Sequence, residues 1–166
     1  MNKNTKVEWE EKGKIGGAFT WMKFNKLGDL SAIGRIPDHN LVVTAGLGEI
    51  TGLALSDVGG TAFDYLEVGT DATAASAGQS ALVAAITDSG LARAAGTGTQ
   101  QTVTVANDTL QLTYTWSSIS ASKTIREVGV FNAASAGTML ARAVINVSAT
   151  SEDTLALTYR STLTSS

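Results

Sequence analysis

The chain has 166 residues, which suits one domain, and its 43% hydrophobic residues suffice for a packed core. Charged residues make up only 16%, against roughly 25% in an ordinary soluble domain. The absence of cysteine excludes disulfides and cysteine-ligated metals, and the sequence predicts neither a signal peptide nor a membrane-spanning segment. This neutral composition is typical of a protein docked in an assembly, although a mildly polar β-domain would share it.

The net charge of −3 is unevenly distributed. Residues 1–26 hold six lysines and three glutamates, a net +3, whereas the remainder holds six basic and twelve acidic residues, a net −6. The first segment is therefore either suited to an acidic surface or simply solvated. Nucleic acid is not an expected partner, because the lysines are scattered and the whole chain is negative.

Residues 1–30 are predicted to form an extended N-terminal arm, with residues 31–166 as a β-sandwich-like domain. Aromatic residues separated by glycines and alternating with charges indicate extended chain here, with a hairpin as one possibility. Tryptophans in such surroundings need burial, on their own domain or on a neighbour, and we favour the neighbour. The candidate docking residues are Trp9, Phe19, Trp21, Phe24, Lys3, Lys6, Lys12 and Lys14.

Two short helices are predicted in the middle of the chain. Residues 32–43 are expected to be extended, at an edge or with a turn at Pro37, before a helix over Ala45–Leu55 that is capped by Thr44. Its glycines each cost roughly 1 kcal/mol relative to alanine, so it needs tertiary packing. A central strand is predicted over residues 63–69, followed by a second helix over Ala81–Ile86. The expected buried stripe of the first helix comprises Leu47, Ile50, Leu53 and Ala54.

The C-terminal half has the clearest pattern. Apolar residues alternate with threonine-rich positions over residues 109–116, preceded by a predicted strand at Val103 and Val105 and a turn at Asn107 and Asp108. Further strands are predicted over residues 123–131, 138–147 and 155–163. Strands at about ten-residue spacing predict a mainly β fold, an antiparallel β-sandwich or barrel with the two short helices.

Motifs for catalysis are not apparent. His39 is the only histidine, and its neighbour Asp38 would point to the opposite face of a strand. The glycine pairs lack the phosphate-loop pattern, and the carboxylates show no metal-ligand spacing. The sequence therefore predicts no catalytic, cofactor-binding or metal residues. Arg126 and Glu127 interrupt an apolar strand, so one of them faces inward, or they form a subunit contact, or they form an outward pair.

The order of several segments resembles that of small structural proteins of tailed bacteriophages, described as head-decoration or tail-fibre-like. The matching segments lie within residues 39–163, and the arm lies outside the match. They are 39–47, 65–70, 125–132, 137–142 and 153–159. The resemblance implies a β-rich virion protein and no catalytic residues.

Three functions then compete. No shaft-forming repeat is present, so a compact domain with an arm favours capsid decoration, in which the arm docks on the particle. A tail or neck fibre component for host attachment is second, and a virion-associated glycan hydrolase is a distant third. The expected partners are further copies, as a homotrimer, and the major capsid protein or other virion proteins, with no membrane. The expected location is the outer surface of the virion, after assembly in the host cytoplasm.

Overall fold

The structure is a computed structural model, and it describes residues 17–36, 41–55 and 57–163. Within these residues the chain is mainly β, with ten strands and one helix. The elements are β1 (Ala18–Phe24), β2 (Leu30–Ile36), β3 (Leu41–Val42), α1 (Thr44–Leu53), β4 (Tyr65–Gly69), β5 (Ala94–Ala95), β6 (Thr97–Gln101), β7 (Thr109–Trp116), β8 (Lys123–Phe131), β9 (Met139–Ala149) and β10 (Thr154–Thr162).

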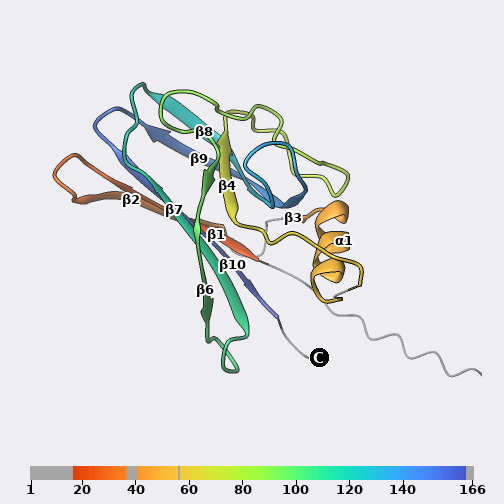
Figure 1. Cartoon of the computed structure of the whole chain (residues 1–166). Coiled ribbons are helices and arrows are strands. Elements are labelled where there is room, and N and C mark those ends of the chain that lie inside the picture. The colour runs from red at the N-terminus through yellow and green to blue at the C-terminus, as the bar shows by residue number, and fades with distance from the viewer. Residues whose placement is uncertain (1–16, 37–40, 56, 164–166) are drawn as a thin grey trace, which may run out of the picture.

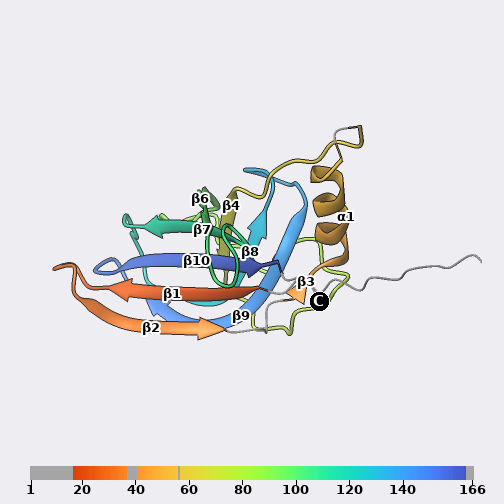
Figure 2. The same ribbon diagram turned by 90° about the horizontal axis from the view of Figure 1, so that it is seen from below.

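The strands form two antiparallel five-stranded sheets (Figures 1 and 2). We call them sheet A, in the order β2-β1-β10-β7-β6, and sheet B, in the order β3-β9-β8-β4-β5. Each sheet keeps its own two edge strands, so the predicted barrel is not closed. The edges of sheet A are seven and five residues long, whereas those of sheet B are two residues each.

One hydrophobic core lies between the inner faces of the sheets. In β7, Leu112 and Trp116 are almost fully buried, as the alternation of residues 109–116 predicts, and β10 contributes Leu157 and Tyr159 beside them. Sheet B contributes residues such as Val128 to the same core. Apolar side chains at every second position thus position both sheets, because successive side chains of a strand point to opposite faces.

The outer face of sheet A carries a row of threonines. Thr20 of β1 pairs with Thr158 of β10, which pairs with Thr113 of β7, which in turn pairs with Thr97 of β6. The hydroxyl oxygens of Thr113 and Thr158 are 3.1 Å apart, within hydrogen-bond distance. The row extends over four strands, and Arg35 of β2 continues it at the edge.

Helix α1 confirms the first predicted helix, but it packs through glycines. A Cβ at Gly46 would lie 2.7 Å from the Cα and the carbonyl oxygen of Leu140, and one at Gly52 would lie 2.6 Å from the carbonyl oxygen of Gly59. The predicted leucine stripe is wrong in part, since Leu47 and Leu53 are exposed while both glycines are buried. The residue before the helix is Val43, and no side chain caps it. Close backbone approach therefore replaces leucine packing as the docking contact.

The second predicted helix, over residues 81–86, is not formed. The segment is an irregular loop with a single antiparallel bridge between Gly69 and Ala85. Its backbone amides at Val83 and Ala84 donate to the buried carboxylate of Glu127, so a tertiary contact satisfies donors that a helix would have used.

The predicted strand at Val103 and Val105 is likewise wrong. Both side chains are exposed, and the segment is a turn whose amides bind the carboxylate of Asp108. Besides β10, the strand that pairs with β7 is β6, which is not predicted from the sequence. The turn at Asn107 is confirmed by its positive φ of 61°.

Strand β1 shows that much of the predicted arm belongs to a sheet. Residues 18–24 pair with β10 on one side and β2 on the other. The predicted boundary at residue 30 therefore falls inside the β1–β2 hairpin. Residues 1–16 lie outside the described part of the chain, and we refer to them as the N-terminal segment.

Candidate functional site

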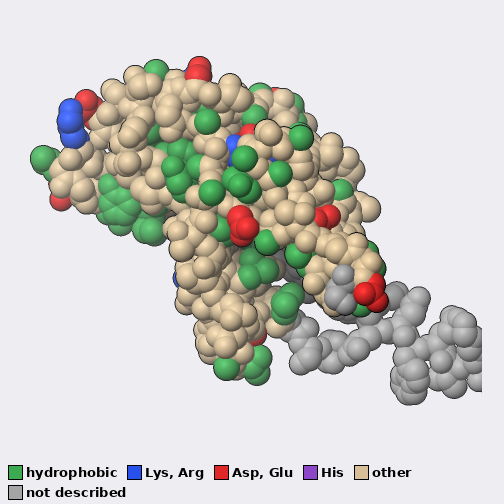
Figure 3. All heavy atoms as spheres, in the orientation of Figure 1, with side chains coloured by type: hydrophobic (Ala, Val, Ile, Leu, Met, Phe, Trp, Pro, Cys, Tyr) green, Lys and Arg blue, Asp and Glu red, His purple; other side chains and the backbone are tan. Residues whose placement is uncertain are grey.

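An apolar groove of about 570 Å³ lies between α1 with the chain following it and the inner face of sheet A. Helix α1 contributes Ile50 and Leu53, the strands of sheet A contribute residues such as Leu110 and Tyr159, and Val130 of sheet B also lines it. The groove forms because Gly46 holds the helix against β9, while β6 and β7 extend past it. Figure 3 shows hydrophobic side chains in the hollow between these parts of the surface.

The rim of this groove exposes hydrophobic side chains. Leu53 is 45% exposed, Leu110 is 39% exposed and Leu163 is 56% exposed. Asp64 is the one ionisable carboxylate among the lining residues, and the other polar groups are hydroxyls, side-chain amides and the backbone. Cavities that bind ligand-sized groups typically measure roughly 300–1,000 Å³, so the groove is large enough for a big side chain or a short peptide.

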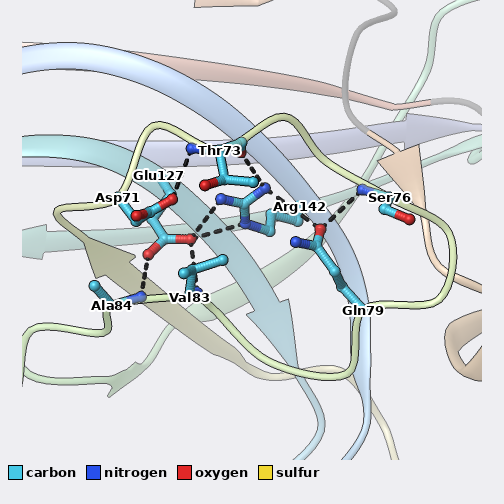
Figure 4. A network of polar contacts seen from close by, with 8 residues as sticks. All are labelled: Asp71, Thr73, Ser76, Gln79, Val83, Ala84, Glu127 and Arg142. Carbon is cyan, nitrogen blue, oxygen red and sulfur yellow. Dashed lines mark hydrogen bonds and ion pairs between the residues drawn. The ribbon is translucent and has the colours of Figure 1, made fainter.

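A buried ion pair lies on the outer face of sheet B, which is turned away from sheet A. Glu127 of β8 and Arg142 of β9 are fully buried, and both Nε and Nη2 of Arg142 lie 2.8 Å from Oε2 of Glu127. The loop over residues 70–86 wraps around this pair (Figure 4). Arg142 donates to the carbonyl oxygen of Thr73 at 2.8 Å, while the Glu127 carboxylate accepts from the amides of Val83 and Ala84. The pair therefore fastens this loop to the sheet.

Two glycines make room for this arrangement. A Cβ at Gly69 would lie 2.5 Å from Oε1 of Glu127, and one at Gly129 would lie 2.9 Å from the side chain of Leu82. Leu82 itself packs in a second hydrophobic cluster with Phe131 and Met139. The outer face of sheet B is thus a second small core, closed by the loop.

A second ion pair lies beside the first. Nη2 of Arg93 is 2.8 Å from Oε2 of Glu67, and both side chains are about nine-tenths buried. Arg93 also donates to the carbonyl oxygens of Ala133 and Ala136, and its guanidinium lies 3.7 Å from the ring centroid of Phe131. This network joins β4 to the β8–β9 turn.

The carboxylate of Asp108 is held by a cluster of hydrogen bonds at the turn before β7. It accepts hydrogen bonds from the amides of Val105, Thr104 and Val103 at 2.7–2.9 Å and from the hydroxyl of Thr109. These bonds, foremost the one from Val105, lower the pKa of Asp108 to about 2. They close the β6–β7 turn, so this perturbed group has a local structural role.

The predicted docking residues fall into different environments. Phe19 is fully buried in the core, with its ring centroid 5.0 Å from that of Tyr159, so it has no exposed surface for docking. Trp21 is partly buried, and its ring occupies the space where a Cβ of Gly34 would lie. Phe24 is half-buried at the end of β1. The remaining candidates lie outside the described residues: Trp9, Lys3, Lys6, Lys12 and Lys14.

Of Arg126 and Glu127, Glu127 is fully buried, beneath the loop that covers the outer face of sheet B. Its partner is Arg142 of the same chain, so its contact is intramolecular instead of crossing a subunit boundary. Arg126 is partly buried. The pKa of the nearby Asp71 is lowered, first by hydrogen bonds from Thr73 and to a smaller degree by the charges of Arg142 and Arg126. Arg126 as a subunit contact stays a prediction.

The other members of the buried networks are Arg142, Arg93 and Glu67, and none of them is predicted as a site residue from the sequence. Each interrupts or flanks an apolar stretch, which is the same signal that singles out Arg126 and Glu127. The groove is not predicted either, since its walls come from segments far apart in the sequence, such as Leu53 and Leu163.

Two searches of the described residues give negative results. No group of three or more His, Cys, Asp or Glu residues placed to hold a metal ion occurs in that part of the chain. Nor does any helix there have the length and apolar character needed to cross a membrane. Comparisons of the chain with protein-family models, with curated protein sequences and with solved structures find no match.

Proposed function

We propose that the chain is a non-enzymatic structural protein of a tailed-bacteriophage particle, a β-sandwich that decorates the capsid. The supporting observation is how its charged groups are used. The buried ion pairs Glu127–Arg142 and Glu67–Arg93 hold the chain against sheet B, whereas the groove is lined mainly by apolar groups. Among the described residues, the lining of this groove offers no set of nucleophile, base and oxyanion donors of the kind that bond cleavage needs.

The segments that carry the resemblance to phage structural proteins support the same proposal. Residues 125–132 correspond to β8 and the residue after it, residues 137–142 lead into β9, and residues 153–159 lead into β10. Their charged residues Glu127 and Arg142 meet in the buried pair. The resemblance is therefore carried by strands and by the contacts that hold them, as expected for a shared scaffold.

The location on the particle surface is supported by the outer face of sheet A. Its row of threonines carries no charge, and the paired positions on either side add Arg35 and Arg160. The uncharged row of threonines leaves little repulsion where neighbouring copies meet along it, which favours a homo-oligomer such as a trimer. Docking then falls to the N-terminal segment, which holds Trp9 and four lysines.

Truncation of the N-terminal segment tests the docking part. Deletion of residues 1–16 removes no described strand, so we expect a folded protein that no longer co-sediments with particles. Deletion of residues 1–26 also removes β1, which pairs with β10 and β2, and is expected to unfold the domain. The Trp9→Ala variant should weaken co-sedimentation more than Ile33→Ala, a matched loss of an exposed apolar side chain on β2.

Labelling of whole particles tests the location. If the protein decorates the capsid, a label on its C-terminus should be seen on the heads of intact particles. Labels confined to the tail or neck would favour the fibre alternative. Turnover of a polysaccharide or peptidoglycan that is lost when one carboxylate is changed would contradict the non-enzymatic proposal.

A further inference from the structure

We propose that, in the free protein, the groove between α1 and sheet A binds the Val7–Trp9 stretch of the N-terminal segment of the same chain. At the exposed rim of the groove, Leu53, Leu110 and Leu163 face a shared hollow. Contiguous apolar surface of this kind generally marks a site that something covers.

The N-terminal segment enters the fold beside this groove. Ala18, the first residue of β1, pairs with Arg160, which stands between the groove-lining residues Tyr159 and Ser161 on β10. Neighbouring strands lie about 4.8 Å apart, so the chain before Ala18 starts one strand away from the groove wall. Figure 2 shows β1 and β10 side by side.

The length of the segment is sufficient. Trp9 precedes Gly17 by eight residues, a distance of up to about 26 Å in extended chain at roughly 3.3 Å per residue. Gly13 and Gly16 permit a change of direction, because glycine adopts backbone conformations closed to other residues. Trp9 can therefore reach the wall of the groove that β10 forms without altering β1.

Composition selects this segment as the occupant. The stretches of chain outside the described residues are 1–16, 37–40, 56 and 164–166. Only residues 1–16 supply large apolar side chains beyond a proline: Met1, Val7, Trp9 and Ile15. Val7 and Trp9 are two residues apart with glutamates on either side of Trp9, so in extended chain both apolar groups face one way and the charges the other.

Binding within one chain is favoured over binding between copies by its effective concentration. A short flexible tether holds a ligand at about millimolar concentration near its site, well above the concentration of a second copy in dilute solution. The groove thus covers Trp9 in the free protein, and release of the segment makes this residue available for docking on another surface.

Introduced cysteines give a direct test, because the chain has none of its own. The groove pair combines Glu10→Cys with Leu53→Cys at the rim. The control pair combines Glu10→Cys with Ile33→Cys, which is exposed on β2 and faces away from the core. Under mild oxidation of the full-length monomer, the groove pair should form an intramolecular disulfide about tenfold faster than the control pair, independent of protein concentration.

Further variants link the crosslink to the apolar anchor. Adding Trp9→Ala to the groove pair should reduce its rate to that of the control pair, whereas Lys12→Ala should leave it unchanged. Leu163→Cys in place of Leu53→Cys provides a second rim position, also exposed. Circular dichroism of each variant establishes that the β fold is retained.

Three outcomes would overturn the inference. Covalent dimers in place of intramolecular crosslinks would show that a second copy occupies the groove. Equal rates for the groove and control pairs, or a rate unaffected by Trp9→Ala, would show that the groove does not hold the segment. These measurements use the free protein, so a negative crosslinking result would not contradict docking on particles. Likewise, a negative co-sedimentation result would not contradict binding of the segment in the groove.

Discussion

The two sheets differ in how their outer faces are covered and in where they place charged residues. Sheet B is covered on both faces, by the core on one and by the loop over residues 70–86 on the other, and it holds the ion pair Glu127–Arg142 in its interior. Sheet A is covered on one face and shows threonines on the other. Sheet B therefore buries charge where it fixes a loop, whereas the outer face of sheet A shows a row of hydroxyls flanked by Arg35 and Arg160.

This difference explains why the low charge content does not weaken the fold. A buried ion pair contributes little compared with hydrophobic packing, but it is costly to break once formed. It also specifies one loop arrangement, since Thr73, Val83 and Ala84 all depend on it. In sheet A, by contrast, the outer threonines can be changed individually without leaving a charge buried.

The largest expected effect comes from breaking the buried pair in sheet B. Arg142→Met leaves Glu127 without its cation and should lower the free energy of unfolding by about 3–5 kcal/mol. Arg160→Met on the outer face of sheet A removes an exposed hydrogen bond to Gln111 and should change it by less than about 0.5 kcal/mol. Urea denaturation of both variants measures the difference. Equal losses in the two variants would mean that the pair does not distinguish the sheets.

A double variant sharpens this result. Replacing both charges, as in Glu127→Leu with Arg142→Met, removes the uncompensated carboxylate and should be less destabilising than Arg142→Met alone. The loop amides of Val83 and Ala84 would still lose their acceptor, so full recovery is not expected. A double variant that is less stable than the single one would show that the pair itself, and not the unpaired charge, carries the stability.

A smaller effect is expected where α1 approaches sheet B. Gly46→Ala places a Cβ 2.7 Å from the backbone of Leu140 and should destabilise the protein by about 1–3 kcal/mol. Gly48→Ala meets nothing within 4 Å and should stabilise it by up to about 1 kcal/mol through higher helix propensity. Thermal unfolding of the two variants should therefore shift in opposite directions, and shifts of the same sign would contradict the glycine-mediated contact.

The smallest effect concerns the turn at the end of sheet A. The pKa of Asp108 is about 2 in the folded chain, below the ordinary value of 3.8. A lowered pKa contributes stability that is fully present above the unfolded value and is lost as the pH falls through the folded value. We therefore expect a loss between pH 4 and pH 2 that is shallower in Asp108→Asn. Acid unfolding curves of the two proteins with an identical slope would exclude this contribution.

Strand positions could be predicted from the sequence where a local apolar pattern coincides with burial in the structure. Strand β8 matches its predicted range, because residues 123–131 form a short run rich in β-branched and apolar residues with a single glycine and no proline. Prediction from the sequence failed where tertiary contacts decide. Residues 81–86 have helix-forming composition, but their amides bind Glu127, and Val103 and Val105 look like strand residues although Asp108 folds them into a turn. Neither acceptor can be recognised from local propensity.

The candidate site was less predictable than the fold. Phe19 and Trp21 resemble interface anchors in sequence, yet pairing of β1 with β10 places Phe19 in the core. The groove depends on the distance between α1 and sheet A, which is set by the contact of Gly46 with the backbone of Leu140. From the sequence alone, the glycines of α1 indicate only a less stable helix. Arrangements made between distant segments thus determine the site, whereas alternation within segments determines the strands.

Because their edge strands differ in length, the two sheets differ in how readily they can pair with a strand of another molecule. The edges of sheet B, β3 and β5, are two residues each and are too short to guide a further strand. In sheet A, β2 presents seven residues of open edge with the exposed side chains of Leu30 and Ile33. Strand addition between molecules, whether in an ordered oligomer or in aggregates, is therefore expected at β2. Hydrogen exchange on the concentrated protein should then show added protection there, and protection confined to β3 and β5 would contradict it.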